Sequence, residues 1–391
     1  MKKIALPLFI IFLLCSFNSN RDIHLDFLNN QNQSAKDYVI NLFKTNDIVI
    51  LCEREHKEFT QYELFLEIVK DPYFIENVGH IFTEVGVVNM DDEINDFLQS
   101  KQQDSLSTRN KITSLFRDID FQPYWHCYSY PWFLGELFKI NQNLNRNMKL
   151  MLHPTDYSFE WSKCRTPQDY KAFDDRINNR DSVMAQNIIN RFKQIRLGND
   201  KRKKALVIMN YKHAFLKDHR FLGEITHNTG RYLSDEYPGK VASVYIMGLA
   251  IPKERNYTLV KNGKWDYYFE KSKKTDVGFN LSSSPFGSEE FDAIPPDSIQ
   301  NFRYKDIFTG LIFYKPVQEH KLRTGWNGFA TNEFIPELRR RITIFNNAKD
   351  LGMTDEDIEN KLLENNIEKE VQYNNIIKLR KEIDKWQEEL Q

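Results

Sequence analysis

The chain has 391 residues, of which 41% are hydrophobic and 28% charged, which is enough for one large domain with an appendage or for two domains. Its 54 basic and 55 acidic residues give a formal net charge of −1, so no overall field attracts nucleic acid or an anionic membrane. We therefore expect no nucleic-acid partner. The expected partner is a small-molecule substrate, and the expected state is a monomer or weak dimer.

The first 20 residues have the features of an export signal. A positive end at Lys2-Lys3 precedes an apolar run, Ile4 to Leu14, that is too short to span a bilayer comfortably. We expect cleavage near residues 16–20 and an exported protein of the periplasm or cell envelope. The alternative is a lipoprotein anchored in the membrane through Cys15, although residues 12–14 lack the small side chain expected before such a cysteine.

Strands and helices alternate along the next part of the chain. Helical periodicity lies between the apolar runs, and residues 91–99 and 105–118 read as helices of a lid-like insertion. This alternation predicts a three-layer α/β/α fold with a largely parallel, mixed central sheet in a domain spanning residues 35–335. The predicted strands are 48–51, 78–85, 149–152, 205–209 and 241–247, and the other helices are 35–44, the segment after 56, 167–196 (as two helices) and 220–236.

The alternation of predicted strands and helices ends at about residue 252. The dipeptide Asn262-Gly263 predicts a hairpin over residues 257–269. Residues 336–391 are charged and helical, and form a C-terminal extension whose last apolar residues step by three and four positions. We expect residues 354–390 to form helix, to pack back on the domain and to be dispensable for the site.

Polar side chains follow four of the predicted strands. They are Glu53 with His56, then Glu84, Asp156 and His213. Because the carboxyl ends of parallel strands meet at one edge of a sheet, we expect these groups in one cleft. A histidine held by a carboxylate is a general base that activates water, whereas two histidines with glutamates can hold a metal. The residues alone leave both interpretations open.

The order and spacing of these segments resemble the erythromycin esterase family and its wider superfamily, which includes the ChaN-like haem-binding lipoproteins. The resemblance covers about residues 35–250 and includes an Arg-Asp-x-x-Met-Ala-x-Asn helix that is matched in full from Arg180 to Asn187. The matching segments are 52–57, 82–84, 124–144, 154–156, 180–187, 210–213 and 229–233.

The resemblance implies a hydrolase that attacks an ester, lactone or related bond with metal-free, histidine-activated water and without a cofactor. In that case Glu53 orients His56, which is the base, and Glu84 with His213 completes the catalytic group. The implied substrate-binding residues are Arg180, Asp156, Trp125 and Asp181.

Three positions depart from the family pattern. Both glycines of the first motif are replaced, by Cys52 and Lys57, and one histidine of the later pair is Asn210. These changes argue against macrolide substrates. Two alternatives stay open: a ChaN-like surface protein that binds haem or another ligand without turnover, and a metal-dependent hydrolase of the same superfamily.

Overall fold

The computed structural model describes residues 22–101, 104–124, 128–221, 224–250, 257–294 and 302–390. The predicted export signal, the anchoring alternative at Cys15 and the predicted substrate contact at Trp125 lie outside these residues. Among the described residues, none of the helices combines the length and apolar character that crossing a membrane requires.

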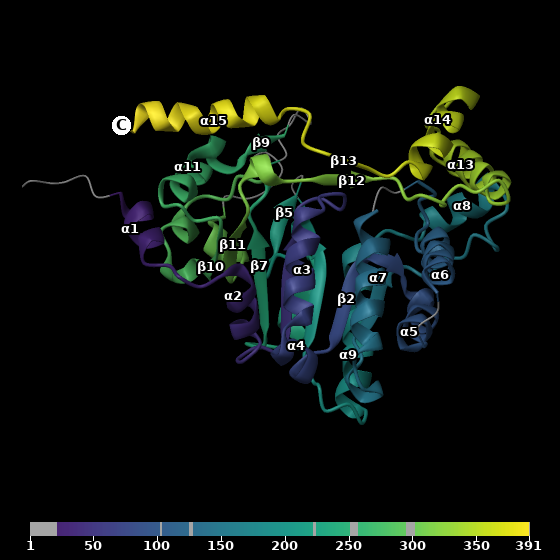
Figure 1. The fold of residues 1–391 in the computed structure, drawn as a ribbon, viewed down its shortest axis with the longest axis horizontal. Helices are drawn as coiled ribbons and strands as arrows, with labels where there is room; N and C mark the ends of the chain where they lie inside the picture. The colour runs from purple at the N-terminus through teal and green to yellow at the C-terminus, as the bar shows by residue number, and fades with distance from the viewer. Residues whose placement is uncertain are drawn as a thin grey trace, which may run out of the picture.

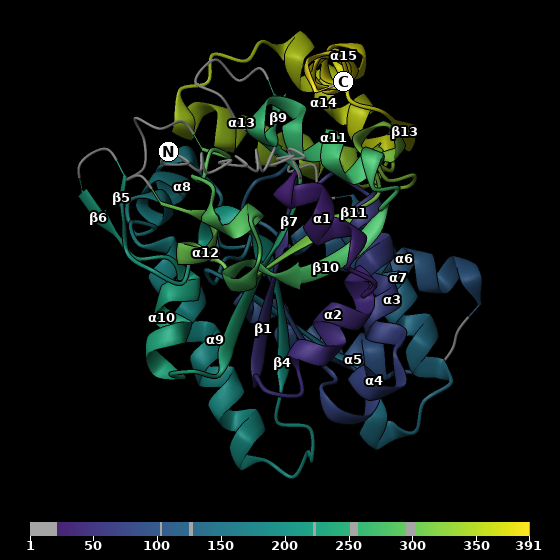
Figure 2. The ribbon, with the colours of Figure 1, turned by 90° about the vertical axis from the view of Figure 1, so that its left-hand side faces the viewer.

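A seven-stranded mixed sheet forms the centre of the molecule, with the strand order β10-β11-β7-β1-β4-β2-β3 (Figures 1 and 2). All neighbouring strands pair in parallel except β10 and β11, which are antiparallel. The strands are β1 Ile48–Glu53, β2 His80–Val87, β3 Met151–Asp156, β4 Ala205–Asn210, β7 Val241–Ile246, β10 Asp276–Asn280 and β11 Gly310–Tyr314.

Strand β1 lies between β4 and β7 and is buried over its whole length. Its side chains alternate between two cores: Val49 and Leu51 face one, while Ile48 and Ile50 face the other. A strand covered on both faces needs apolar residues at every position, which is why this run is continuously hydrophobic and not alternating.

Helices cover both faces of the sheet, as predicted (Figure 1). Helices α2, α3 and α7 contribute to one core, and α9, α10 and α11 to the other. The helices are α1 Ile23–Asn29, α2 Ala35–Leu42, α3 Thr60–Lys70, α4 Pro72–Asn77, α5 Asp91–Gln99, α6 Ser105–Asp118, α7 Ser129–Gln142, α8 Pro167–Asp174, α9 Arg180–Leu197, α10 Thr229–Glu236, α11 Lys264–Lys271, α12 Tyr304–Ile307, α13 Ile335–Lys349, α14 Asp355–Asn366 and α15 Ile376–Glu389.

Two local predictions were wrong. The expected hairpin at residues 257–269 is a short strand, β9 (Thr258–Leu259), followed by a turn and helix α11. Asn262 and Gly263 do adopt the positive φ angles of a turn, 50° and 84°, but the turn leads into a helix that buries Trp265 and Phe269.

The helix predicted over residues 220–236 begins only at Thr229. A small hairpin of β5 (His219–Phe221) and β6 (Glu224–Thr226) occupies the preceding residues. The Thr229 N–H donates to the Asp181 carboxylate over 2.8 Å. A side chain distant in sequence therefore caps this helix, which local periodicity cannot indicate.

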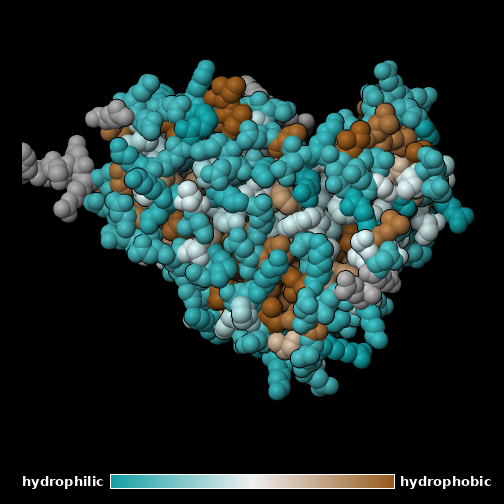
Figure 3. All heavy atoms as spheres, in the orientation of Figure 1, coloured by the Kyte–Doolittle hydropathy of each residue, from teal (hydrophilic) through white to brown (hydrophobic). Residues whose placement is uncertain are grey.

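The C-terminal region crosses the carboxyl edge of the sheet. Strands β12 (Leu322–Thr324) and β13 (Lys369–Val371) form an antiparallel ribbon. Helices α13 and α14 lie on one side of this ribbon, and α15 lies on the other (Figure 1). Helix α15 packs against α11 and buries Leu379 and Ile383 completely. The surface in the same view is predominantly hydrophilic, and its upper outline dips between these two sides (Figure 3).

Candidate functional site

The predicted polar groups meet at the carboxyl edge of the sheet. Glu53 is the last residue of β1, Glu84 lies in β2 and Asp156 ends β3. His213 lies in the short 3₁₀ turn after β4, and Arg180 opens helix α9. Contacts connect these five residues and His56 into one cluster.

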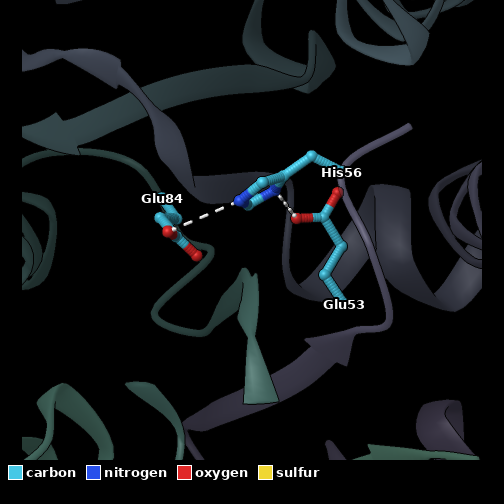
Figure 4. A group of neighbouring side chains, drawn as sticks. All are labelled: Glu53, His56 and Glu84. Carbon is cyan, nitrogen blue, oxygen red and sulfur yellow. Dashed lines mark hydrogen bonds and ion pairs between the residues drawn. The ribbon is translucent and has the colours of Figure 1, made fainter. Parts of the chain in front are cut away.

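The first part of the cluster is a short hydrogen bond between Glu53 and His56. Nδ1 of His56 lies 2.7 Å from Glu53 Oε2, and the Tyr62 hydroxyl donates to Glu53 Oε1 over 2.6 Å. A carboxylate only accepts hydrogen bonds, so Nδ1 carries the hydrogen and Nε2 is directed elsewhere. Figure 4 shows the His56 ring between the Glu53 and Glu84 side chains.

Glu84 is the centre of the cluster. Its Oε1 accepts from the Arg180 guanidinium at 2.9 Å and lies 3.4 Å from His213 Nε2 and 3.7 Å from His56 Nε2. Its Oε2 accepts from the Asn210 N–H at 2.7 Å. A carboxylate that is only 2% exposed thus bridges two histidines and an arginine.

Arg180 is held in place by Asp156. Its Nε and one terminal nitrogen donate to Asp156 Oδ2 over 2.9 and 2.7 Å. Asp156 is fully buried, and its other oxygen accepts the Tyr157 N–H. The planar guanidinium therefore binds Asp156 on one side and donates from its other terminal nitrogen to Glu84 over 2.9 Å, while His213 Nε2 lies 3.3 Å from that nitrogen.

His213 is oriented by Asp181. Both Asp181 oxygens lie 3.0 Å from His213 Nδ1, and one of them also accepts from the N–H and hydroxyl of Thr229. The remaining ring nitrogen of His213 then points toward Glu84. Two histidines, each fixed by its own carboxylate, thus approach one glutamate oxygen.

The net effect of the cluster on His56 is to stabilise its charged form. Burial lowers the pKa of His56, but the charges of Glu53 and Glu84 outweigh burial and the repulsion from Arg180, so its pKa is raised above 6.5. The two carboxylates therefore favour the imidazolium form of His56, the form that a general base reaches when it takes a proton.

His213 is charged at neutral pH. Burial opposes this charge, yet Glu84 and Asp181 together raise the pKa of His213 to about 10. Conversely, the pKa of Glu84 is held well below its usual value, because His213, Arg180 and His56 outweigh burial. The centre of the site therefore favours a carboxylate at Glu84 with an imidazolium at His213 and a guanidinium beside it.

Glu53, His56 and Glu84 can also be considered as metal ligands, since one donor atom from each lies within 4.8 Å of the others. However, both Glu53 oxygens already accept hydrogen bonds, from Tyr62 and His56. Glu84 Oε1 is likewise bound by the Arg180 guanidinium, a cation. A divalent ion would have to displace these contacts, so this donor set fits a metal poorly in the observed arrangement.

The three departures from the family pattern have clear structural positions. Cys52 is buried in β1 with its Sγ 3.6 Å from Ser243 Oγ, and burial raises the pKa of its thiol to about 12. The Lys57 ammonium pairs with Glu55 at 3.1 Å. Asn210 binds Glu84 through its N–H and the Arg54 carbonyl through its side chain. It thus connects the His56 loop to Glu84 without any basic group.

Sequence reasoning missed two buried residues of the site. Tyr62 lies in the helix predicted after residue 56, and only the fold brings its hydroxyl to Glu53. Asp120 follows a charged helix end, yet it is 6% exposed and interacts electrostatically with Asp156, Arg180 and His56. Asp120 Oδ1 accepts the Gln122 N–H, and Oδ2 is buried without a hydrogen-bond partner among the described residues.

A small pocket adjoins His56. Its volume is about 90 Å³, below the roughly 300–1,000 Å³ of typical drug-sized ligand sites. It is lined by Arg54, Glu55, His56, Asn210, Tyr211, Leu249, Tyr257 and Tyr373.

Together these observations define a three-layer α/β protein with an acid–histidine–arginine cluster at the carboxyl edge of its sheet. No protein-family model matches the sequence, and no curated protein matches it. Several solved structures are similar in fold.

A protein from Bacillus cereus aligns with a TM-score of 0.48 and 12% identity over 74% of this chain and 95% of its own. A variant of the erythromycin esterase EreC in its open conformation aligns with a TM-score of 0.44 and 11% identity. The alignment covers 70% of this chain and 91% of the EreC chain. ChaN of Campylobacter jejuni, with cofacial haem binding, aligns with a TM-score of 0.34 and 12% identity. The alignment covers 53% of this chain and 84% of the ChaN chain. These values describe a partial similarity of fold.

Proposed function

We propose that the protein is a hydrolase that attacks an ester, lactone or related bond with water activated by His56. The observation that carries this proposal is the 2.7 Å hydrogen bond from His56 Nδ1 to Glu53, which leaves Nε2 directed at the centre of the cluster. A histidine whose far nitrogen is fixed by a carboxylate is the usual arrangement of a general base.

In the proposed reaction, His56 Nε2 removes a proton from water as the oxygen attacks the carbonyl carbon. The carbonyl oxygen becomes an oxyanion, which the Arg180 guanidinium and the His213 imidazolium are placed to stabilise by charge. When the tetrahedral intermediate collapses, the His56 imidazolium returns its proton to the leaving oxygen. Glu53 stabilises the imidazolium between these steps, and water supplies every atom that is added.

The second candidate is a metal-dependent hydrolase, which would use the donor atoms of Glu53, His56 and Glu84 that lie within 4.8 Å of one another. A metal would first have to displace the hydrogen bonds of Tyr62 and Arg180 to these carboxylates. Elemental analysis of protein purified without chelators separates the two proposals. Stoichiometric zinc or manganese, lost together with activity when Glu84 is replaced by glutamine, would contradict the metal-free mechanism.

The proposal is tested by screening p-nitrophenyl esters and small lactones with the native protein and with His56→Ala. A positioned general base contributes about 10²–10⁴-fold in rate, so His56→Ala should lose at least about 100-fold in kcat/KM. His227→Ala is the matched control, because His227 pairs with Asp218 on an exposed surface. Equal activity of native protein and His56→Ala would overturn the assignment of the base.

We also propose that the protein acts outside the cytoplasm, on the basis of residues 1–20. Intact-mass measurement of the protein recovered from cells tests this. A start near residues 17–21 supports simple export, a diacylglyceryl group on Cys15 supports anchoring, and an intact Met1 overturns both.

A further inference from the structure

The C-terminal region is attached directly to the loop that carries His56. The Phe59 N–H donates to the Lys321 carbonyl over 2.7 Å, and the Lys321 N–H donates to Thr60 Oγ1 over 3.0 Å. In addition, the Arg323 N–H donates to the Lys57 carbonyl over 2.8 Å. Residues 57–60, which follow the proposed base, are therefore fixed against residues 321–323.

The same ribbon brings Tyr373 to the site. Leu322 pairs with Val371 and Thr324 with Lys369, so β13 runs antiparallel to β12 (Figure 1). The Val371 end of β13 therefore lies beside Leu322, which bridges to Glu58 in the His56 loop. The chain leaves β13 at Gln372, whose side chain donates to the Gln318 carbonyl over 2.7 Å. Tyr373 follows, is 6% exposed, and forms part of the wall of the pocket beside His56.

The wall of this pocket is largely apolar. Tyr211, Leu249, Tyr257 and Tyr373 contribute rings and an aliphatic side chain. The volume of about 90 Å³ is small beside the roughly 300–1,000 Å³ of drug-sized ligand sites. A short acyl group of about four heavy atoms therefore suits this space, whereas a long acyl chain or a macrolide ring needs a larger one.

Arg54 and Glu55, the arginine and the carboxylate of the wall, are both already paired. Glu55 binds the Lys57 ammonium at 3.1 Å. The Arg54 guanidinium donates to Glu58 at 3.0 Å and to the carbonyls of Met247 and Tyr314 at 2.9 and 2.6 Å. Arg54 therefore offers no strong site for a second anion, and a charged ligand group would lose its hydration without compensation. These contacts favour an uncharged occupant.

We infer that this pocket binds the short, uncharged acyl group next to the scissile bond, and that Tyr373 of the C-terminal region limits its length to about four carbons. This inference rests on the proposed hydrolase function. It assigns to the C-terminal extension the control of substrate size at a site built by the N-terminal two thirds of the chain.

The test compares p-nitrophenyl acetate, butyrate and octanoate with the full chain. The native protein should prefer butyrate to octanoate by at least about 10-fold in kcat/KM, since a few methylenes without room typically cost this much. Tyr373→Ala should reduce that preference at least 10-fold, whereas Tyr373→Phe should keep it because the ring remains. Trp386→Ala is the matched control: Trp386 anchors α15 through the Asn262 carbonyl but does not line the pocket.

The outcomes separate the two proposals. If Tyr373→Ala and the native protein show the same chain-length profile, the pocket assignment is overturned and the hydrolase proposal stands. If no ester is hydrolysed, the hydrolase proposal fails, and saturation-transfer NMR with butyramide and hexanamide then tests the pocket alone.

In that NMR experiment, binding of butyramide only by the native protein and of both amides by Tyr373→Ala supports the inference. Absence of a butyramide signal, or hexanamide binding by the native protein, overturns it. Should Tyr373→Ala lack a cooperative thermal transition, Tyr373→Leu replaces it, because leucine fills part of the ring's volume.

Discussion

The carboxylate of Glu53 lies 2.7 Å from His56 Nδ1, and its second oxygen accepts the Tyr62 hydroxyl at 2.6 Å. Glu53 is the last residue of a buried central strand, so its carboxylate position is set by the sheet and not by a loop. The ring of His56 thereby acquires a fixed tautomer and a fixed direction, which is the geometric requirement for a base that acts repeatedly on water.

Replacing Glu53 by glutamine should lower kcat by about 10²-fold or more, because the neutral amide no longer stabilises the His56 imidazolium formed during the reaction. Tyr62→Phe removes one hydrogen bond to the same carboxylate, so its effect should stay below about 10-fold. Steady-state kinetics on the best ester of the screen measures both. A larger loss for Tyr62→Phe than for Glu53→Gln would show that Tyr62, and not Glu53, is the more important partner.

The pH profile of kcat/KM should report His56. Its pKa is raised above 6.5 by Glu53 and Glu84 against the effect of burial, so activity should rise with pH through a midpoint above 6.5 as the base loses its proton. Glu84→Gln removes one of the two negative charges and should move that midpoint to lower pH. A midpoint that is unchanged, or that rises, would exclude His56 as the titrating base.

Arg180→Met should destabilise the fold, because it leaves the fully buried Asp156 and the 2% exposed Glu84 without their shared cation. Breaking a buried ion pair on one side costs about 3–5 kcal/mol. Urea denaturation measures the loss. The double variant Arg180→Met with Asp156→Asn should recover part of it, and no recovery would mean that Asp156 is not a principal partner of Arg180.

The sequence predicted the architecture well for a physical reason. Continuous apolar runs at 48–51 and 205–209 are required of strands buried on both faces, and polar residues directly after such runs must lie at one edge of a parallel sheet. This reasoning identified Glu53, His56, Glu84 and His213 as neighbours. Their ion-pair distances of 2.7–3.7 Å confirm that they lie together.

The partners of those residues could not be predicted in the same way. The family resemblance implies substrate binding by Asp181 and Asp156, and in the structure Asp181 contacts His213 while Asp156 contacts Arg180. Pairing of this kind depends on where helix α9 begins relative to β3 and β4, which involves residues far apart in sequence. The sequence does not indicate that Asp120 is buried, because an acidic residue just after a charged helix end is usually exposed to solvent.

Asp120→Asn should change the pH dependence of stability. Burial, with a contribution from Asp156, raises the pKa of Asp120 to about 8, above its ordinary value of 3.8. Between those values the folded state holds a proton that the unfolded state releases, so this residue makes the protein less stable as pH rises. The Asp120→Asn variant has no ionisable group at this position and therefore lacks this loss of stability at high pH.

The free energy of unfolding of Asp120→Asn, relative to that of the native protein, should therefore increase from pH 4 to pH 8. At about 1.4 kcal/mol per pKa unit, the upper limit of the gain is roughly 6 kcal/mol. Urea denaturation at pH 5 and pH 8 measures it. A difference between the two proteins that does not vary with pH would show that Asp120 is ionised in the folded state.

Truncation after Asn346 now has an expected outcome opposite to the one that the sequence suggested. The removed region is not a single helix, since β13 separates α14 from α15. It also contributes buried residues to both cores: Ile358, Leu362, Tyr373, Leu379 and Ile383.

At about 1.5–3 kcal/mol for each large apolar side chain, five such residues contribute roughly 8–15 kcal/mol, which is comparable to the whole stability of a typical domain. The truncated chain should therefore aggregate or unfold, as seen by size-exclusion chromatography and circular dichroism. Removing only residues 387–391 is the control, because Leu379 and Ile383 then stay in place. A truncated chain that is folded, monomeric and active toward butyrate would show that neither the ribbon nor Tyr373 belongs to the site.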